Sequence, residues 1–348
     1  MKVNRKELRD ILSILSPGLA KREFVPQSTH FIFFENEVAT FNDKILLTHP
    51  YTSETPFSVK GIEFFRLIDG ITDEDIEITV VKGKVKVKSK GTSASMSTIS
   101  EENNVLPESI ELVEHSRKDW KPLPKDFLEG ISLCSFSVSP DLTKGVLACV
   151  GVIGEYCYAL DHARASVFQM DAALSEDLFI IGKEAMELAK FPVIEYCIGG
   201  NWGHFRTEDD VTFSCKLMKG SFPLAQVEST LEKMIDLPTI VLPAELKATV
   251  DNIVVLASDL IDKSGRLIMM DIRDGEVFVK ASNELGHVEK TLPCKYDGPS
   301  ISLRINSKFL SQILEKTTEL SVQGHMLLFS SGSFSHLLAQ TGSPKKEE

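Results

Sequence analysis

Residues Gly182–Leu217 read GKEAMELAKFPVIEYCIGGNWGHFRTEDDVTFSCKL, and this stretch decides the fold. Its first part, Lys183–Lys190, consists of strong helix formers. Three apolar stretches follow, separated by Gly-Gly-Asn and Glu-Asp-Asp, residue types that tolerate tight or left-handed turns. The stretch therefore predicts one helix followed by three strands, at Val193–Ile198, Trp202–Thr207 and Val211–Leu217.

The same pattern recurs 124 residues earlier and 124 residues later, which indicates an internal repeat. Helices are predicted at Ser58–Asp69 and Asn306–Lys316. Ser58, Gly182 and Asn306 stand at the same place in the three copies, and all three residue types suit the position before a helix. The strands predicted after the two outer helices are Ile76–Val81, Lys84–Ser89, Ala94–Ile99, Glu319–Val322, Met326–Phe329 and Ser333–Leu338.

A second helix-plus-strands unit precedes each of these copies. Its helices are predicted at Asn4–Leu15, Lys125–Cys134 and Pro243–Ala257. Asn4 with Glu7 resembles a capping box, and Pro suits the first position of a helix. The strands predicted in these units are Thr29–Phe34, Glu37–Phe41, Ile45–His49, Lys144–Val150, Glu155–Leu160, Arg164–Met170, Arg266–Ile272, Glu276–Ala281 and His287–Pro293.

The chain is therefore predicted to be an α+β protein of three tandem domains, each a doubled helix-plus-antiparallel-strands unit, at residues 1–120, 121–238 and 239–340. Pro-punctuated links at Lys118–Pro124 and Asp236–Pro243 agree with these boundaries. The polar tail 341–348 is expected to be disordered. Six such units leave open sheet edges, and a closed ring is one arrangement that pairs them.

Composition favours a soluble cytoplasmic protein. The hydrophobic fraction is 43%, and no apolar run approaches the ~18 residues that span a bilayer. The first residues form an amphipathic helix without the apolar core of a secretory signal. The six cysteines show no metal-type spacing and are predicted to be buried free thiols. The net charge of −12 opposes adhesion to nucleic acid over the whole surface, although one basic face is compatible with it.

Four segments together resemble the bacterial DNA polymerase III β subunit family, the sliding clamps. Thr212–Pro223 (TFSCKLMKGSFP) is similar to the family's FTSKLV-G-FPDY signature, and Tyr158–Val167 (YALDHARASV) to its VATDGHRLAV segment. Ser58–Gly70 is similar to the second helix of the family's first domain, and Ser16–Pro26 to its GPLGGR-x-x-x-P loop. The order and spacing of all four carry the resemblance, which covers about residues 1–340.

The resemblance implies a head-to-tail homodimeric ring, half of which is one chain. Such a ring encircles duplex DNA without sequence preference and tethers polymerase. DNA polymerase and clamp loader would bind through short hydrophobic peptides. The resemblance implies no catalytic residue, cofactor or metal. A sliding ring needs only modest positive charge on its inner helices, because phosphate contacts carry no sequence information.

The candidate DNA-binding residues are basic residues off the apolar helix stripes, together with a loop pair in which Arg22 matches the family's DNA-contacting arginine. They are Arg5, Lys6, Arg9, Lys21, Arg22, Lys60, Arg66, Lys125, Lys183, Lys190, Lys247, Lys308 and Lys316. The lysines that alternate along Lys82–Lys90 are interpreted first as a solvated strand face, and second as a DNA-approach patch.

The candidate partner-peptide pocket follows from the resemblance. It comprises Leu160, His162, Arg164, Ala165, Pro223, Val227, Leu337 and Leu338. Leu224–Val227 lacks the family's D-Y-R-R, and Leu337–Gln340 replaces its M-P-M-R-L strand, so the peptide preference is expected to differ. These departures favour a divergent clamp, such as one encoded by a bacteriophage.

Two other functions stay open at this point. The first is an enzyme with an interdomain cleft, for which Asp161 and His162 are the candidate pair; neighbours on an extended segment point to opposite faces, so a turn or pocket role is favoured. The second is a structural hub that never binds DNA. Trp202 and His204 are expected in a half-buried core rather than on a stacking surface.

Overall fold

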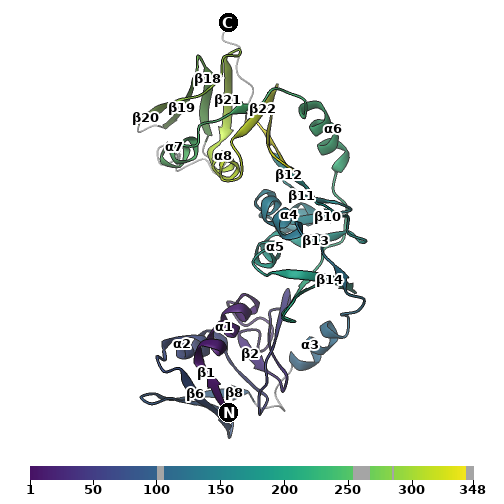
Figure 1. Ribbon diagram of the computed structural model, residues 1–348, viewed down its shortest axis with the longest axis vertical. Helices are drawn as coiled ribbons and strands as arrows, with labels where there is room; N and C mark the ends of the chain where they lie inside the picture. The colour runs from purple at the N-terminus through teal and green to yellow at the C-terminus, as the bar shows by residue number, and fades with distance from the viewer. Residues whose placement is uncertain (100–105, 254–266, 284–285, 342–348) are drawn as a thin grey trace. The chain divides into compact units, whose positions relative to one another are not determined.

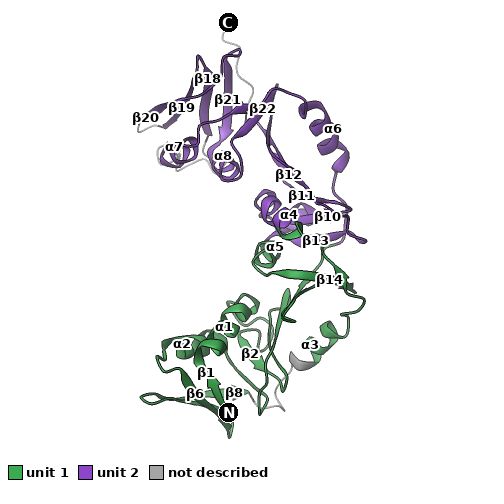
Figure 2. Ribbon diagram, viewed as in Figure 1, with its two compact units in different colours: residues 1–128, 183–218 green, residues 129–182, 219–348 purple. Residues whose placement is uncertain are grey.

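The computed structural model describes residues 1–99, 106–253, 267–283 and 286–341. It contains two compact units, residues 1–128 with 183–218 and residues 129–182 with 219–348 (Figure 2). Each unit holds one half of the predicted second domain, because continuous sheets join that domain's halves to its neighbours in sequence. The predicted tail lies, apart from Thr341, outside the described residues.

Six copies of a strand–helix–three-strand unit follow one another along the chain (Figure 1). The first copy is β1 (Lys2–Asn4), α1 (Arg5–Leu15), β2 (His30–Phe33), β3 (Glu37–Phe41) and β4 (Ile45–Pro50). The second is β5 (Phe57–Lys60), α2 (Gly61–Gly70), β6 (Asp75–Val81), β7 (Lys84–Lys88) and β8 (Ser93–Ile99).

The middle of the chain repeats the same order twice. The third copy is β9 (Lys121–Pro122), α4 (Phe127–Cys134), β10 (Cys149–Ile153), β11 (Tyr156–Leu160) and β12 (Arg164–Gln169). The fourth is β13 (Leu178–Ile181), α5 (Gly182–Leu188), β14 (Val193–Gly199), β15 (Trp202–Thr207) and β16 (Thr212–Lys216).

The last third completes the series. The fifth copy is β17 (Ile240–Val241), α7 (Leu246–Ile253), β18 (Leu267–Arg273), β19 (Glu276–Asn283) and β20 (Gly286–Pro293). The sixth is β21 (Ile301–Asn306), α8 (Ser307–Leu314), β22 (Glu319–Gln323), β23 (Met326–Ser331) and β24 (Phe334–Ala339).

Successive copies exchange their first strands. β5 joins β2, β3 and β4, whereas β1 joins β6, β7 and β8. The same exchange places β13 beside β10, β9 beside β14, β21 beside β18 and β17 beside β22. Every four-stranded sheet is therefore closed at one side by a strand from the neighbouring copy, which ties the two copies of a domain together.

Two antiparallel strand pairs then join the sheets of different domains. β4 pairs with β16 in the first unit, and β12 pairs with β24 in the second. A further pair, β5 with β8, joins the two sheets of the first domain, so the first unit has a 12-stranded sheet. The pair of β12 and β24 builds an 8-stranded sheet, and β20-β19-β18-β21 is a separate 4-stranded sheet.

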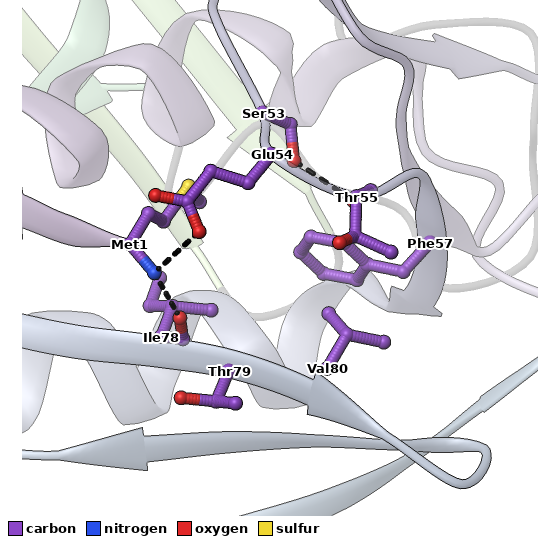
Figure 3. A pocket seen from close by; sticks show the side chains of 8 residues that line it. All are labelled: Met1, Ser53, Glu54, Thr55, Phe57, Ile78, Thr79 and Val80. Carbon is purple, nitrogen blue, oxygen red and sulfur yellow. Dashed lines mark hydrogen bonds and ion pairs between the residues drawn. The ribbon is translucent and has the colours of Figure 1, made fainter.

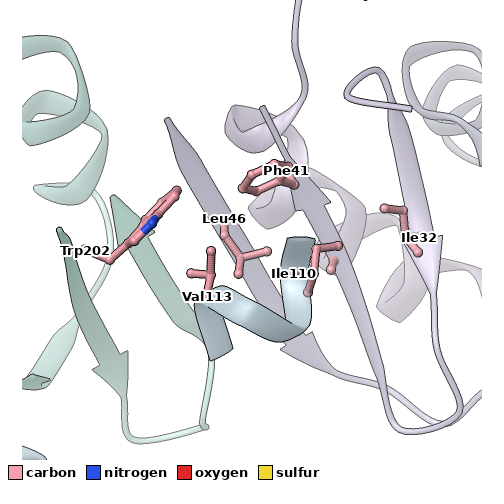
Figure 4. Packing of buried hydrophobic residues seen from close by; sticks show 7 residues of the cluster. Ile32, Phe41, Leu46, Ile110, Val113 and Trp202 are labelled. Carbon is pink, nitrogen blue, oxygen red and sulfur yellow. The ribbon is translucent and has the colours of Figure 1, made fainter. Parts of the chain in front are cut away.

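Linker helix α3 (Leu106–Glu114) covers the sheet face opposite α1 and α2 in the first unit. Its Ile110 and Val113 pack on Ile32, Phe41 and other residues of a buried cluster (Figure 4). Phe33 of the same strand β2 meets Phe64 of α2, with ring centroids 6.0 Å apart. Strand β2 is thus buried on both faces, which explains why Phe31, Ile32 and Phe33 are all apolar.

The sequence identified the helices and most strands of the repeat, and the α+β class is confirmed. Asn4 and Asn306 cap α1 and α8, accepting hydrogen bonds from the Glu7 and Lys308 amides at 3.0 Å each. Ser58 does not cap a helix, which corrects the prediction at that copy. It lies in β5, and α2 begins three residues later at Gly61.

Further corrections concern short elements. The strand before each helix was not predicted, since stretches of two to six residues carry little periodic signal. Most of the predicted strand Lys144–Val150 is the 3-10 segment Leu142–Ala148. Helix α7 begins at Leu246 and not at Pro243, and residues 254–257 of its predicted span lie outside the described residues.

Three histidines are buried in the sheets, His30, His204 and His336, in accord with the core position expected for His204 and Trp202. His336 of β24 shares a hydrogen bond of 2.8 Å between its Nδ1 and the Ser166 hydroxyl of β12, across the strand pair that joins two domains. Burial, followed by the nearby Arg164 charge, lowers the pKa of His336 to about 3. The side chain is therefore neutral in the folded protein at neutral pH.

We expect the stability of the second unit to decrease as the pH falls from about 6.5 towards 3. In this window the unfolded state binds a proton on His336 and the folded state does not. The free energy of unfolding therefore falls by about 1.4 kcal/mol for each pH unit. Urea unfolding of wild type and His336→Asn at several pH values measures this slope. The slope for His336→Asn should be smaller by the equivalent of one bound proton, and a slope equal to that of wild type would contradict the assignment.

Candidate nucleic-acid interface and partner surface

Helices α1 and α2 bury one face and expose basic residues on the other. Leu8 and Leu12 of α1 are buried, and the Arg9 guanidinium on its outer side lies 3.0 Å from the Asp69 carboxylate of α2. None of the 13 candidate DNA-binding residues is buried. Nine of them form no ion pair within the described part of the chain: Arg5, Lys6, Lys21, Arg22, Arg66, Lys125, Lys183, Lys308 and Lys316.

The remaining four candidates pair with carboxylates, which reduces their effective charge. They are Arg9, Lys60, Lys190 and Lys247. In the second unit the Lys247 ammonium bridges α7 and α8, lying 2.7 Å from Asp251 and 3.2 Å from Glu315. Ten candidates lie in the first unit, so the described basic residues are concentrated on its helices and loops.

The loop after α1 carries Lys21 and Arg22. It begins after the 3-10 turn Ser16–Gly18 and is closed by a 2.8 Å hydrogen bond from the Ala20 amide to the Ser28 carbonyl. Lys60, at the residue before α2, lies 3.7 Å from the Glu23 carboxylate of the loop. The structure therefore brings Lys21, Arg22 and Lys60, all exposed, to the same end of the helix pair.

The alternating lysines of β7 lie away from this surface. Lys84, Lys86 and Lys88 are exposed, whereas the intervening Val85 and Val87 are fully buried. Their cross-strand neighbours on β8 are serines, and Glu77 of β6 stands opposite Lys88. The solvated-face interpretation fits this arrangement, because the lysines point from the sheet away from the core.

The candidate pocket residues divide between two faces of the sheet in the second unit. Directly opposed residues of an antiparallel pair lie on the same face. Leu160, Ala165 and Leu337 are opposed in series across β11, β12 and β24. Tyr158 shares this face, and its hydroxyl lies 3.3 Å from the Glu228 carboxylate of linker helix α6 (Leu224–Met234).

Helix α6 also contributes the buried Val227, and the exposed Pro223 precedes it. Leu160, Ala165, Leu337 and Val227 are only 3–8% exposed, so little of their apolar surface is open to solvent. Neither linker helix was predicted from the sequence, and α6 begins at Leu224, where the sequence lacks the family's D-Y-R-R.

Arg164 and Leu338 form the opposite face. The Arg164 guanidinium donates to the Gln312 side chain and to the Phe136 carbonyl, each at 2.6 Å, and pairs with Asp161 at 3.0 Å. It also lies 4.0 Å from the ring centroid of Phe309 of α8. With its side chain 6% exposed, Arg164 packs sheet against helix and is not free to receive a peptide.

Asp161 and His162 do not form a catalytic pair. Both carboxylate oxygens of Asp161 accept hydrogen bonds, one from the Ala163 and Arg164 amides and the other from the Arg164 guanidinium. His162 is exposed in the same turn. Asp161 therefore shapes the turn between β11 and β12, the role that the sequence favoured.

Two cavities of the first unit do not resemble a catalytic cleft. One of about 90 Å³ lies where the Met1 amine contacts the Ile78 carbonyl and Glu54 (Figure 3). Another of about 420 Å³ lies between the β2–β3 turn and α3, lined by Phe34, Asn36, Ile110 and four glutamates. Burial, and then the Glu114 charge, raise the pKa of Glu37 in that cavity to about 7. Its acidic lining is unsuited to DNA.

The described residues contain no cluster of His, Cys, Asp or Glu arranged to hold a metal ion. The six cysteines are buried thiols that form no disulfide, as predicted. Among the described helices, none has the length and apolar character needed to cross a membrane.

Solved structures of similar fold cover nearly the whole chain. A DNA polymerase III subunit beta from Pseudomonas aeruginosa has a TM-score of 0.79 and 16% identity over 98% of this chain and 99% of its own. The β subunit from Streptococcus pyogenes has a TM-score of 0.79 and 15% identity over the same shares. This chain has the β-subunit fold.

A DnaN sliding clamp from Bartonella birtlesii, bound to griselimycin, has a TM-score of 0.81 and 17% identity over 99% of both chains. No family model matches the sequence, and no curated protein sequence matches it either. The β-subunit fold is thus kept where sequence similarity has largely been lost, in agreement with the divergence inferred from the sequence.

Proposed function

We propose that this chain is a DNA sliding clamp, a processivity factor that encircles duplex DNA and tethers a polymerase. The observation that carries the proposal is the match of the whole chain, from first to last copy of the repeat, to structures described as sliding clamps. The exposed basic residues on the α1–α2 pair add the sequence-independent phosphate contacts that such a role needs.

The free strand edges support a head-to-tail homodimer. Within the chain, the last strand of a first half-unit pairs with the last strand of a second half-unit, as β4 does with β16 and β12 with β24. The two corresponding strands left over are β20, which has one unpaired edge, and β8, which β5 pairs only at Thr98 and Ile99. Pairing β20 of one chain with β8 of another would repeat the same junction a third time, and two such junctions would close a ring.

The sheet face that carries Leu160, Ala165 and Leu337 is the proposed docking surface for a short hydrophobic peptide from polymerase or clamp loader. Pro223 and Val227 belong to the same region, and His162 lies exposed at its end. Arg164 and Leu338 act from the opposite face, as supports of the sheet and not as contacts of the peptide.

The test combines stoichiometry and topology. Native mass measurement should give a dimer, and protein loaded on nicked circular DNA should be retained at high salt and released when the circle is cut. A ring holds circular DNA without tight phosphate contacts, so retention depends on closure and not on affinity. A monomer at micromolar concentration, or equal retention on circular and linear DNA, would reject the clamp and favour a hub without a DNA role.

A further inference from the structure

The loop between α1 and β2 is held in one conformation by its own hydrogen bonds. The Gln27 amide donates to the Glu23 carboxylate at 2.7 Å, and the Ser28 hydroxyl donates to the Val25 carbonyl at 2.7 Å. Gln27 has a φ of 64° and is 2% exposed, so the chain turns sharply there around a buried side chain. Val25 packs against the buried cluster of the first unit.

Phe24 points outward from this anchored loop. Its side chain is 88% exposed, the highest value among the large hydrophobic residues that the structure describes. The neighbouring Lys21 and Arg22 are exposed and have no ion-pair partner among the described residues. An aromatic ring open to solvent therefore stands beside two free positive charges, at the end of the basic helix pair.

We propose that Phe24 stacks on an unpaired nucleobase while Lys21 and Arg22 contact the adjacent phosphates. This inference rests on the proposed clamp function and adds a preference within it, for DNA with a single-stranded extension over fully paired DNA. Stacking on an aromatic ring is worth about 1–3 kcal/mol per base and tolerates any sequence.

Charge and shape favour a nucleotide over an apolar protein partner. A hydrophobic docking site is expected to present several neighbouring apolar side chains, whereas Phe24 is flanked by Lys21, Arg22 and Glu23. Bases inside a duplex already stack on each other, so a single ring gains a partner only where a base is unpaired. The loop needs no rearrangement to present the ring, because its backbone is tied at both sides of Phe24.

Fluorescence anisotropy with labelled linear DNA tests the inference on the full chain. Two probes share one duplex, and one of them carries an extension of about ten nucleotides, within the site sizes of single-strand binders. Wild type should prefer the extended probe, and Phe24→Ala should weaken binding to it about tenfold while changing binding to the blunt duplex less than about twofold. Phe24→Tyr should restore the preference.

Leu112→Ala is the matched control, since Leu112 is another exposed apolar residue, 74% exposed on α3, with no role in the loop. It should leave both affinities unchanged. Equal affinities of wild type and Phe24→Ala for the extended probe would overturn the inference, and so would a Phe24→Ala defect confined to polymerase association. Retention of Phe24→Ala on circular DNA is scored separately, so the clamp function can stand when the stacking inference fails.

Discussion

Replacing Arg164 by alanine is expected to lower the stability of the second unit by about 3–5 kcal/mol. The substitution removes a side chain that joins three parts of that unit: the β11–β12 turn through Asp161, helix α8 through Gln312, and the segment before β10 through the Phe136 carbonyl. Asp161 is 13% exposed, so its carboxylate would lose a charged partner without gaining full hydration.

Urea or thermal unfolding of the full chain, followed by circular dichroism, measures the effect. Arg164→Lys should fall between wild type and alanine, since an ammonium keeps the charge but cannot direct donors to three acceptors or stack as a plane on Phe309. Lys280→Ala, at an exposed pair with Glu289 in the same unit, is the control and should leave the midpoint nearly unchanged. An Arg164→Ala midpoint equal to that of the control would show that the pair contributes little.

A proline at Ser95 of β8 is expected to weaken the proposed dimer by roughly 5- to 150-fold, the equivalent of about 1–3 kcal/mol. The Thr98 amide donates to the Gly83 carbonyl, on the β7 side. Amide directions alternate along a strand, so the Ser95 amide points away from β7, in the part of β8 that β5 does not pair. Proline at Ser95 therefore removes a donor for a second chain and leaves the hydrogen bonds to β7 in place.

The same reasoning applies to β20, the proposed partner strand. The Cys294 amide donates to the Gly275 carbonyl, on the β19 side, so the Thr291 amide and the position of Pro293 face outward. Pro293 agrees with this direction. It has no amide hydrogen, so no hydrogen bond to β19 is lost when this residue faces outward. Thr291→Pro should weaken the dimer as Ser95→Pro does.

Analytical ultracentrifugation over a range of concentrations measures both dissociation constants. Ser95→Ala and Thr291→Ala keep the amide and are the matched controls; they should remain dimeric. Circular dichroism should show that the proline variants keep their fold as monomers. Dimers of undiminished stability in both proline variants would place the contact between chains elsewhere.

Local sequence pattern was sufficient to predict the helices of the repeated units and the threefold repeat itself. The stripe Leu8, Ile11, Leu12 and Leu15 is visible in the sequence because helical periodicity is a local property, and Asn4 and Asn306 cap their helices through neighbouring amides. The expected core position of Trp202 is likewise confirmed, at 7% exposure. The basic candidates on these helices were located by the same periodicity.

The exchange of first strands was decided by tertiary structure. β9 and β17 are two residues long, and two residues have no periodicity from which a strand could be inferred. They are strands because β14 and β22 offer them backbone partners far along the chain. The linker helices α3 and α6 were missed for a related reason: what they cover is a second apolar sheet face, which exists only once the strands are paired.

What the sequence by itself determined is the repeated order of helices and strands, the asparagine caps of α1 and α8, and which residue types are exposed or buried. Only the tertiary structure decided which residues meet. Arg164 and Ala165 are neighbours in the chain, yet Arg164 packs on Phe309 of α8 and Ala165 lies on the opposite face with Leu337, because a strand turns successive side chains to opposite faces. The pairing register of β11, β12 and β24 therefore decides which candidate pocket residues share a face. This register cannot be read from the sequence of one strand alone.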